Sequence, residues 1–169
     1  TSNGVQADSG VVDADVLHSL QLTRAFGEND PLKIIGAAKV KELVWHEDAF
    51  AIGFNFGLLT SLVKLDMSVE KASGYRNGSF MASTNGMLLL EEVNMRNNRL
   101  ARNGDNGNVA TLDLSWQGRL KKLDVRGTGL TRVKLATGAP VVQLCLPDTI
   151  EELFLEYLTK LSDSGLIQI

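Results

Sequence analysis

The aliphatic residues of this chain recur in a six-residue pattern in which the first, fourth and sixth positions are apolar. In each copy the fourth and sixth residues share one face of a strand, and the residue between them lies on the other face. The last five copies begin at residues 109, 120, 130, 141 and 150, a nearly fixed step that is typical of a repeat architecture. The pattern therefore predicts short parallel strands stacked in layers. The copies are Val40-Leu43-Trp45, Leu62-Leu65-Met67, Leu90-Val93-Met95, Val109-Leu112-Leu114, Leu120-Leu123-Val125, Leu130-Val133-Leu135, Val141-Leu144-Leu146 and Ile150-Leu153-Leu155.

Two such units are expected to make one layer of about 20 residues, as in other repeat proteins. On this spacing the copies that start at 40, 62, 90, 109, 130 and 150 form one column of strands, and those at 120 and 141 form the opposite column. Residues 72–85 then form a loop that leaves one layer. Turn residues such as Gly127-Thr128-Gly129 separate the copies. A common stack of Leu112, Val133 and Leu153 is the central expectation.

Residues 1–31 lack this pattern and are predicted to be an N-terminal lead-in segment, followed by a solenoid over residues 32–169. Within the lead-in, residues 14–22 fit either a short helix or a strand, because their apolar positions follow neither period clearly. The sequence ends at Leu166-Ile167-Gln168-Ile169, which is strand-like, whereas a terminal repeat needs a polar cap. We therefore expect the solenoid to be truncated at the C-terminus. The predicted fold class is mainly β, a leucine-rich-repeat-like parallel β solenoid with few or short helices.

The composition favours thin repeated layers and not one large central core, because 44% of residues are hydrophobic and only 6% are aromatic. The net charge of -3 provides no basic surface for nucleic acid, so that class of partner is not expected. The longest apolar run, residues 87–90, is far shorter than a membrane span, so no membrane insertion is expected. Cys145 is the single cysteine, which excludes an internal disulfide.

The segment from Leu90 to Leu100 resembles the leucine-rich repeat signature, with Asn98 in the place of its asparagine. Residues 120–130 resemble it again with Thr128 in that place, and residues 144–155 are similar to variant repeats of Bacteroidetes surface proteins and of their phages and prophages. The resemblance is close over residues 85–169, loose over 32–70 and absent from 1–31. The resemblance implies that the chain binds a protein or a glycan, or that it is a structural part of a virion. It also implies a location outside the cell, at the cell surface or in a phage particle.

Candidate catalytic and metal-binding groups are sparse. His18 and His46 are the only histidines and are far in sequence from Cys145, so neither a Cys-His pair nor a zinc site is expected. Residues 103–108 alternate oxygen ligands as a calcium loop does but lack its bidentate glutamate, so a turn is expected there. Glu91-Glu92 and Glu151-Glu152 should point to opposite faces of a strand and cannot act as a carboxylate pair.

Aromatic residues gather in residues 50–56, together with Trp45. They are expected to fill the core of a wide layer, and the alternative is an exposed platform that binds sugar or protein. No catalytic residue, metal ligand or cofactor is predicted, and the chain is not expected to be an enzyme.

The sequence thus predicts a non-catalytic leucine-rich repeat module that binds a protein or a carbohydrate through one strand face. Two alternatives stay open: a structural component of a phage tail or baseplate, and a polysaccharide-active β-solenoid enzyme. Self-association of the chain also stays open. The predicted binding face consists of outward positions on one column of strands: Glu92, Asn94, Thr111, Asp113, Arg132, Lys134, Glu152 and Phe154.

Overall fold

The computed structural model describes residues 11–13, 19–22, 33–45, 55–70, 84–98, 111–154 and 166–168. These residues form short strands, joined by turns and three 3-10 turns, and every strand pairing among them is parallel. The expectation of a mainly β fold with parallel strands and few, short helices is confirmed.

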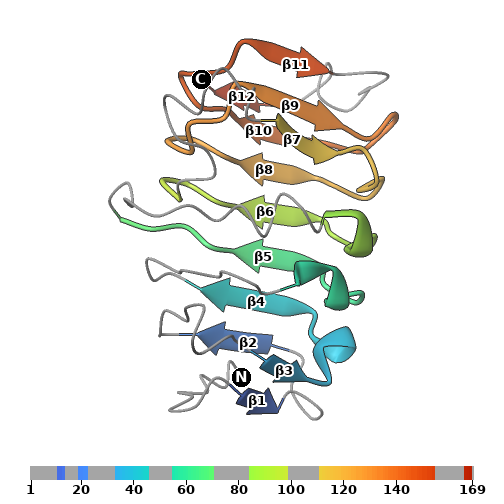
Figure 1. The fold of residues 1–169 in the computed structure, drawn as a ribbon. Coiled ribbons are helices and arrows are strands. Elements are labelled where there is room, and N and C mark those ends of the chain that lie inside the picture. Colours follow the sequence, from blue (N-terminus) through green and yellow to red (C-terminus); the bar gives the residue numbers. More distant parts are fainter. Residues whose placement is uncertain are drawn as a thin grey trace.

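Seven of the strands form one sheet, in the order β12-β10-β8-β6-β5-β4-β2. Figure 1 shows them stacked as a single column from β2 to β12. Their bounds are β2 (Ser19–Leu22), β4 (Glu42–Trp45), β5 (Lys64–Asp66), β6 (Glu92–Asn94), β8 (Lys122–Asp124), β10 (Gln143–Cys145) and β12 (Leu166–Gln168).

The other side of the stack contains two smaller sheets with 3-10 turns between them. A three-stranded sheet has the order β11-β9-β7, and β1 pairs with β3 in a two-stranded sheet. In Figure 1 these strands point the opposite way to those of the seven-stranded sheet. Their bounds, with those of the 3-10 turns, are β1 (Val11–Asp13), β3 (Lys33–Ile35), η1 (Ala37–Lys39), η2 (Phe56–Leu58), η3 (Thr84–Gly86), β7 (Thr111–Leu114), β9 (Arg132–Leu135) and β11 (Glu152–Phe154).

Two of the three 3-10 turns, η2 and η3, pack directly on one another. η3 contacts both η2 and β7, so it occupies the layer between them. A Cβ atom at Gly86 would overlap the Cα atom of Gly57, closer than any tolerated carbon contact. The close approach of these two backbones therefore requires glycine at position 86. Residues 84–85, expected in a loop outside the layers, instead belong to a turn within the stack.

The core lies between the two sides. In the seven-stranded sheet the central residues Leu43, Leu65, Val93, Leu123 and Leu144 are in register on neighbouring strands and are all buried. They belong to one apolar cluster with residues of the three-stranded sheet.

The predicted stack on the opposite side is confirmed. Leu112 is in register with Val133, which is in register with Leu153. Leu112 and Val133 are fully buried, and Leu153 is partly buried against the same core. Burying such aliphatic side chains is the main favourable term in folding.

The predicted assignment of copies to columns was confirmed for the last five copies and was wrong for those that start at 40, 62 and 90. The copies that start at 40, 62, 90, 120 and 141 belong to the seven-stranded sheet, because β6 pairs with β8 and not with β7. The copies at 109, 130 and 150 belong to the three-stranded sheet. Both columns bury the same apolar pattern, so spacing alone does not distinguish them. On the side of the three-stranded sheet, the layers of β5 and β6 have the 3-10 turns η2 and η3 in place of strands.

The parallel pairing also begins before residue 32, the expected start of the repeats. β1 and β2 fall within residues 1–31, and β2 pairs with β4 in the seven-stranded sheet. Residues 19–22 are therefore a strand, which decides between the helix and strand alternatives for that part; residues 14–18 lie outside the described ranges. Near the other end, residues 166–168 form β12 as expected.

Candidate functional site

The outer face of the seven-stranded sheet presents two straight rows of side chains, because alternate residues of each strand point away from the core. Both rows follow from the strand register. From β2 to β10 the first row is Ser19, Glu42, Lys64, Glu92, Lys122 and Gln143, and the second row is Gln21, Val44, Asp66, Asn94, Asp124 and Cys145, of which Cys145 is buried. Ten of these twelve residues are polar or charged, so this face is suited to contact with solvent or a polar partner.

Ion pairs connect neighbouring members of the first row. Lys122 Nζ lies 2.8 Å from Glu92 Oε1, and Lys64 Nζ lies 3.9 Å from Glu92 Oε2. The hydrogen bond from Lys122 is the main reason that the pKa of Glu92 is lowered; the charge of Lys64 acts in the same direction, and partial burial opposes both. Glu92 is therefore ionised at neutral pH and carries no proton to donate.

The second row is held by short-range contacts at the ends of the strands. Asp66 Oδ1 accepts a hydrogen bond of 2.7 Å from Ser68 Oγ, and Asn94 Oδ1 accepts one from the backbone N–H of Arg96. Asp124 pairs with Arg126 at 2.6 Å, and its hydrogen bond raises the pKa of the Arg126 guanidinium. These contacts fix the orientation of the oxygen atoms along the face.

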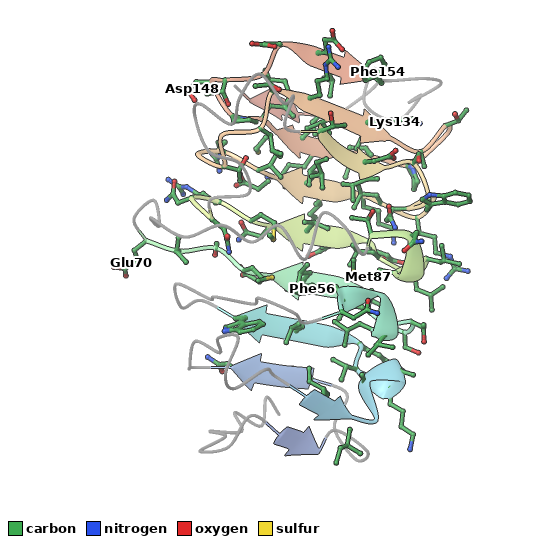
Figure 2. All side chains as sticks on the ribbon, in the orientation of Figure 1. Phe56, Glu70, Met87, Lys134, Asp148 and Phe154 are labelled. Atoms are coloured by element: carbon green, nitrogen blue, oxygen red, sulfur yellow. The ribbon has the colours of Figure 1, made fainter. Side chains whose placement is uncertain are left out.

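Two hollows adjoin these rows. One, of about 270 Å³, crosses β5, β6, β8 and β10 and is lined by residues of both rows from Lys64 to Gln143. The other, of about 610 Å³, lies at the carboxyl ends of β5 and β6 and is lined by Ser68, Val69, Glu70, Asn94, Arg96, Asn97 and Asp124. Figure 2 shows Glu70 on the segment that follows β5, at the outer margin of the stack. Asn94 and Asp124 line both hollows, so they mark the centre of the candidate site.

The backbone below the larger hollow is fixed by Asn97. This residue has a positive φ of 59°, which asparagine tolerates better than most residues. Its Nδ2 donates to the carbonyl oxygens of Val69 and Glu70 in the preceding layer, at 3.1 and 3.3 Å. Neighbouring layers are thereby joined at the carboxyl ends of the strands.

The three-stranded sheet carries six of the eight residues predicted to form the binding face. Thr111 and Asp113 lie on β7, Arg132 and Lys134 on β9, and Glu152 and Phe154 on β11. Figure 2 shows Lys134 and Phe154 near the end of the stack that carries β9 and β11.

Ion pairs also cross this second face. Arg132 Nε lies 2.7 Å from Glu152 Oε2, and Lys134 Nζ lies 3.7 Å from Asp113 Oδ2. Partial burial raises the pKa of Asp113, but hydrogen bonds from Ser115 and the charge of Lys134 outweigh it and lower the pKa overall. Asp113 is therefore ionised at neutral pH.

The remaining two predicted residues, Glu92 and Asn94, lie on β6 in the seven-stranded sheet. The eight residues therefore belong to two faces and do not form one site, which corrects the prediction. The cause is the column assignment: the step from residue 90 to 109 crosses from one sheet to the other. The sequence analysis consequently missed Lys64, Asp66 and Lys122. Aligning the copies at 62, 90 and 120 would have placed these residues beside Glu92 and Asn94.

The structure bears on several candidate chemical groups. Glu91 precedes β6 and Glu92 begins it, and each pairs with a lysine of the next layer: Glu91 with Lys121 at 2.6 Å and Glu92 with Lys122 at 2.8 Å. Cys145 is buried on β10.

Trp45 and Phe56 are both fully buried, as expected of core-filling aromatics. His18, His46, residues 50–54 and residues 103–108 lie outside the described ranges.

Within the described ranges, no group of three or more histidine, cysteine or carboxylate side chains is arranged to hold a metal ion. None of the helices in that part of the chain has the length and apolarity needed to cross a bilayer. Comparison with protein-family models, with curated proteins and with solved structures found no match.

Proposed function

We propose that this chain is a leucine-rich-repeat-like parallel β solenoid that acts as a non-catalytic binding module, with the outer face of the seven-stranded sheet as its binding surface. From β7 to β11 the chain alternates between the two larger sheets at each successive strand, and both sheets share one apolar core. Such an alternation is what a solenoid requires.

Buried polar side chains at the signature positions support the leucine-rich repeat interpretation. Asn98 is buried, and its Nδ2 donates to the carbonyl oxygen of Met67 in the preceding layer at 2.8 Å. Thr128, in the same place one layer later, is buried and donates to the carbonyl oxygen of Val125 at 2.6 Å. Buried backbone carbonyls need such donors. Asn98 supplies one to the preceding layer and Thr128 supplies one within its own turn, so the same signature position carries a buried donor in two layers.

The observation that carries the proposal is the pair of polar rows around the hollow that crosses β5, β6, β8 and β10. Repeat scaffolds present side chains at regular intervals on an extended surface, and this regularity is what they use for recognition. Here Lys64, Lys122 and Glu92 provide charges, and Asn94 and Asp124 provide oriented oxygen atoms. A protein partner with complementary charges or a glycan with hydroxyl groups would meet matching groups on this face.

The same contacts argue against acid–base catalysis on this face. Glu92 and Asp124 each have a cation within 2.8 Å. A general acid requires a carboxyl group whose pKa is raised toward neutrality, whereas Lys122 lowers the pKa of Glu92. The carboxylates are thus suited to recognition.

The test uses the purified chain on glycan and protein arrays, with three single variants of matched chemistry. Asn94→Arg would place a long cationic side chain in both hollows, so we expect it to weaken binding of any captured ligand by at least about tenfold. Asn85→Arg changes an exposed asparagine in η3, away from both rows, and should leave binding unchanged.

Thr111→Arg tests the three-stranded face in the same assay. Loss of binding with Thr111→Arg but not with Asn94→Arg would move the site to that face and refute the seven-stranded sheet as the binding surface. Cleavage of a captured polysaccharide would contradict the non-catalytic role.

A further inference from the structure

The charges of the first row alternate in sign from strand to strand. Glu42, Lys64, Glu92 and Lys122 occupy facing positions on β4, β5, β6 and β8, as the register of the three strand pairs shows. The signs along the stack are therefore minus, plus, minus, plus. The row continues on either side with an uncharged polar residue, Ser19 on β2 and Gln143 on β10.

A row of this kind is complementary to its own reverse. A second copy can be turned by 180° about an axis that runs along the strands between β5 and β6, so that the two sheets face each other. Glu42 of each copy then faces Lys122 of the other, and Lys64 of each faces Glu92 of the other. Every charge of the row meets its opposite, which satisfies the requirement that the two halves of a twofold interface be self-complementary.

The second row is compatible with the same rotation. Asp66 of one copy faces Asn94 of the other, whose amide can donate a hydrogen bond to the carboxylate. Val44 faces Asp124, and no position of this row sets two like charges against each other. The rotation sets β2 of one copy opposite β10 of the other, so β12 has no strand opposite it. Leu166 on β12, which is in register with Gln143, therefore lies outside the paired rows.

We propose that the partner which this face fits is a second copy of this chain, bound face to face about that twofold axis. The inference rests on the proposed function and deepens it, because it names the partner of the same surface. Lys64 and Lys122 have side chains about half exposed, at 48% and 49%, so they can reach a facing carboxylate while they remain near Glu92. Figure 1 shows the strands of this sheet in one unbroken column, which two such faces require.

The size of the face indicates how strong the association is. Six strands spaced about 4.8 Å apart extend about 24 Å. An interface of this width that relies on charged groups belongs with the small, transient interfaces. The dimer is therefore expected to be weak, with a dissociation constant in the micromolar range, and sensitive to salt.

The experiment is sedimentation equilibrium of the full chain over a range of concentrations. Wild type is expected to dimerise at about 0.01 M salt and to lose at least about tenfold in affinity at about 1 M salt, where the screening length falls to about 3 Å. Glu42→Lys and Lys122→Glu each set like charges against one another at two symmetry-related places, so each variant should dimerise at least about tenfold more weakly. Both changes are at exposed positions, and thermal melts verify that the variants are folded.

Mixing the two variants gives the decisive result. In the mixed dimer the introduced lysine faces the introduced glutamate, and the unchanged Glu42 of one chain faces the unchanged Lys122 of the other. The mixture and the double variant Glu42→Lys/Lys122→Glu should both recover wild-type affinity. The matched controls Glu151→Lys and Arg119→Glu reverse exposed charges away from both rows and should dimerise as wild type does.

A monomeric wild type at every concentration would overturn the proposal. A mixture of the two variants that fails to recover affinity would also overturn it. A dimer that is weakened by Lys122→Glu but unaffected by Glu42→Lys would overturn it too, since Lys122 would then face a group other than Glu42. The array experiment with Asn94→Arg separates this failure from a failure of the proposed function. A monomer that binds a ligand through Asn94 refutes only the second copy as partner, whereas loss of the ligand with Thr111→Arg alone refutes the choice of face.

Discussion

Replacement of Asn98 by alanine tests whether side-chain hydrogen bonds between layers contribute to the stability of this fold. Asn98 follows β6 at the signature position, and only 4% of it is exposed. Its Nδ2 lies 2.8 Å from the carbonyl oxygen of Met67, which is 31 residues earlier in the chain and one layer away. The substitution removes this donor and leaves the space that the amide group occupied.

The cost follows from these contacts. Loss of a buried hydrogen bond between uncharged groups destabilises a protein by about 1–3 kcal/mol when it leaves a buried group with fewer partners. For a chain of this length each kcal/mol lowers the melting temperature by about 2–4 °C. With a loss of about 2 kcal/mol, we expect Asn98→Ala to melt about 4–8 °C below wild type.

Asn98→Asp makes the same test with nearly the same shape. The new carboxylate would face a carbonyl oxygen and be buried, so at neutral pH this variant should be less stable than Asn98→Ala. Burial raises the folded-state pKa of the introduced carboxyl above its unfolded value of about 3.9. The protonated form is therefore favoured by folding, and the deficit should shrink as the pH falls through the raised pKa toward the unfolded value.

Urea denaturation monitored by circular dichroism, at neutral and at acidic pH, measures these differences. Asn85→Ala serves as the control, because Asn85 is exposed in η3, and its effect should stay within about 0.5 kcal/mol. An Asn98→Ala variant as stable as the control would refute the idea that the signature asparagine joins the layers.

Three further substitutions test the core, the close contact between turns and the ion pairs of the first row. Leu123→Ala removes a fully buried side chain from the middle of the seven-stranded sheet and should cost about 2–5 kcal/mol in urea denaturation, whereas Leu88→Ala, at a 52% exposed position, should cost under about 0.5 kcal/mol. Gly86→Ala forces apart two turns, because the new Cβ atom would overlap the backbone of Gly57, so we expect a loss of about 1–3 kcal/mol and a lower melting temperature. Lys122→Gln removes the main cause of the lowered pKa of Glu92. A lowered folded-state pKa stabilises the fold at pH values above the unfolded pKa near 4.5. The variant should therefore be slightly less stable than wild type at neutral pH and approach wild type in acid, which melts at a series of pH values would show.

The layers could be predicted from the sequence because burial leaves a direct trace in the pattern of apolar residues. Leu112 and Val133 were expected to stack, and the strands that carry them pair in that register. The apolar triplet specifies which side chains point inward and how neighbouring layers match. It carries no information about which side of the stack a strand occupies, since both sides bury aliphatic residues against the same core.

The candidate site was harder to predict for this reason. Glu92 and Asn94 were selected as outward positions, and the structure places them at the margins of the hollows. The neighbours of Glu92 across the strands, Lys64 and Lys122, are 28 and 30 residues away, and these intervals differ from the expected layer of about 20 residues. The strands nevertheless keep the same register across these longer intervals. Local spacing therefore could not identify the residues that share a face.

The alternating charges of the first row also bear on why such a face would associate with itself. Within one sheet, like charges on neighbouring strands repel and opposite charges attract, so alternation is already favoured inside a single chain. Reversal of an alternating row about its centre gives a different result for odd and for even numbers of charges. A row of three places each charge over one of the same sign, whereas the row of four formed by β4, β5, β6 and β8 places each over its opposite. The even number of charged strands in this sheet is thus what lets every charge of the row find its opposite. Glu42→Gln removes one charge at the end of the row and should weaken the dimer, while the ion pairs of Glu92 with Lys64 and Lys122 within each chain persist.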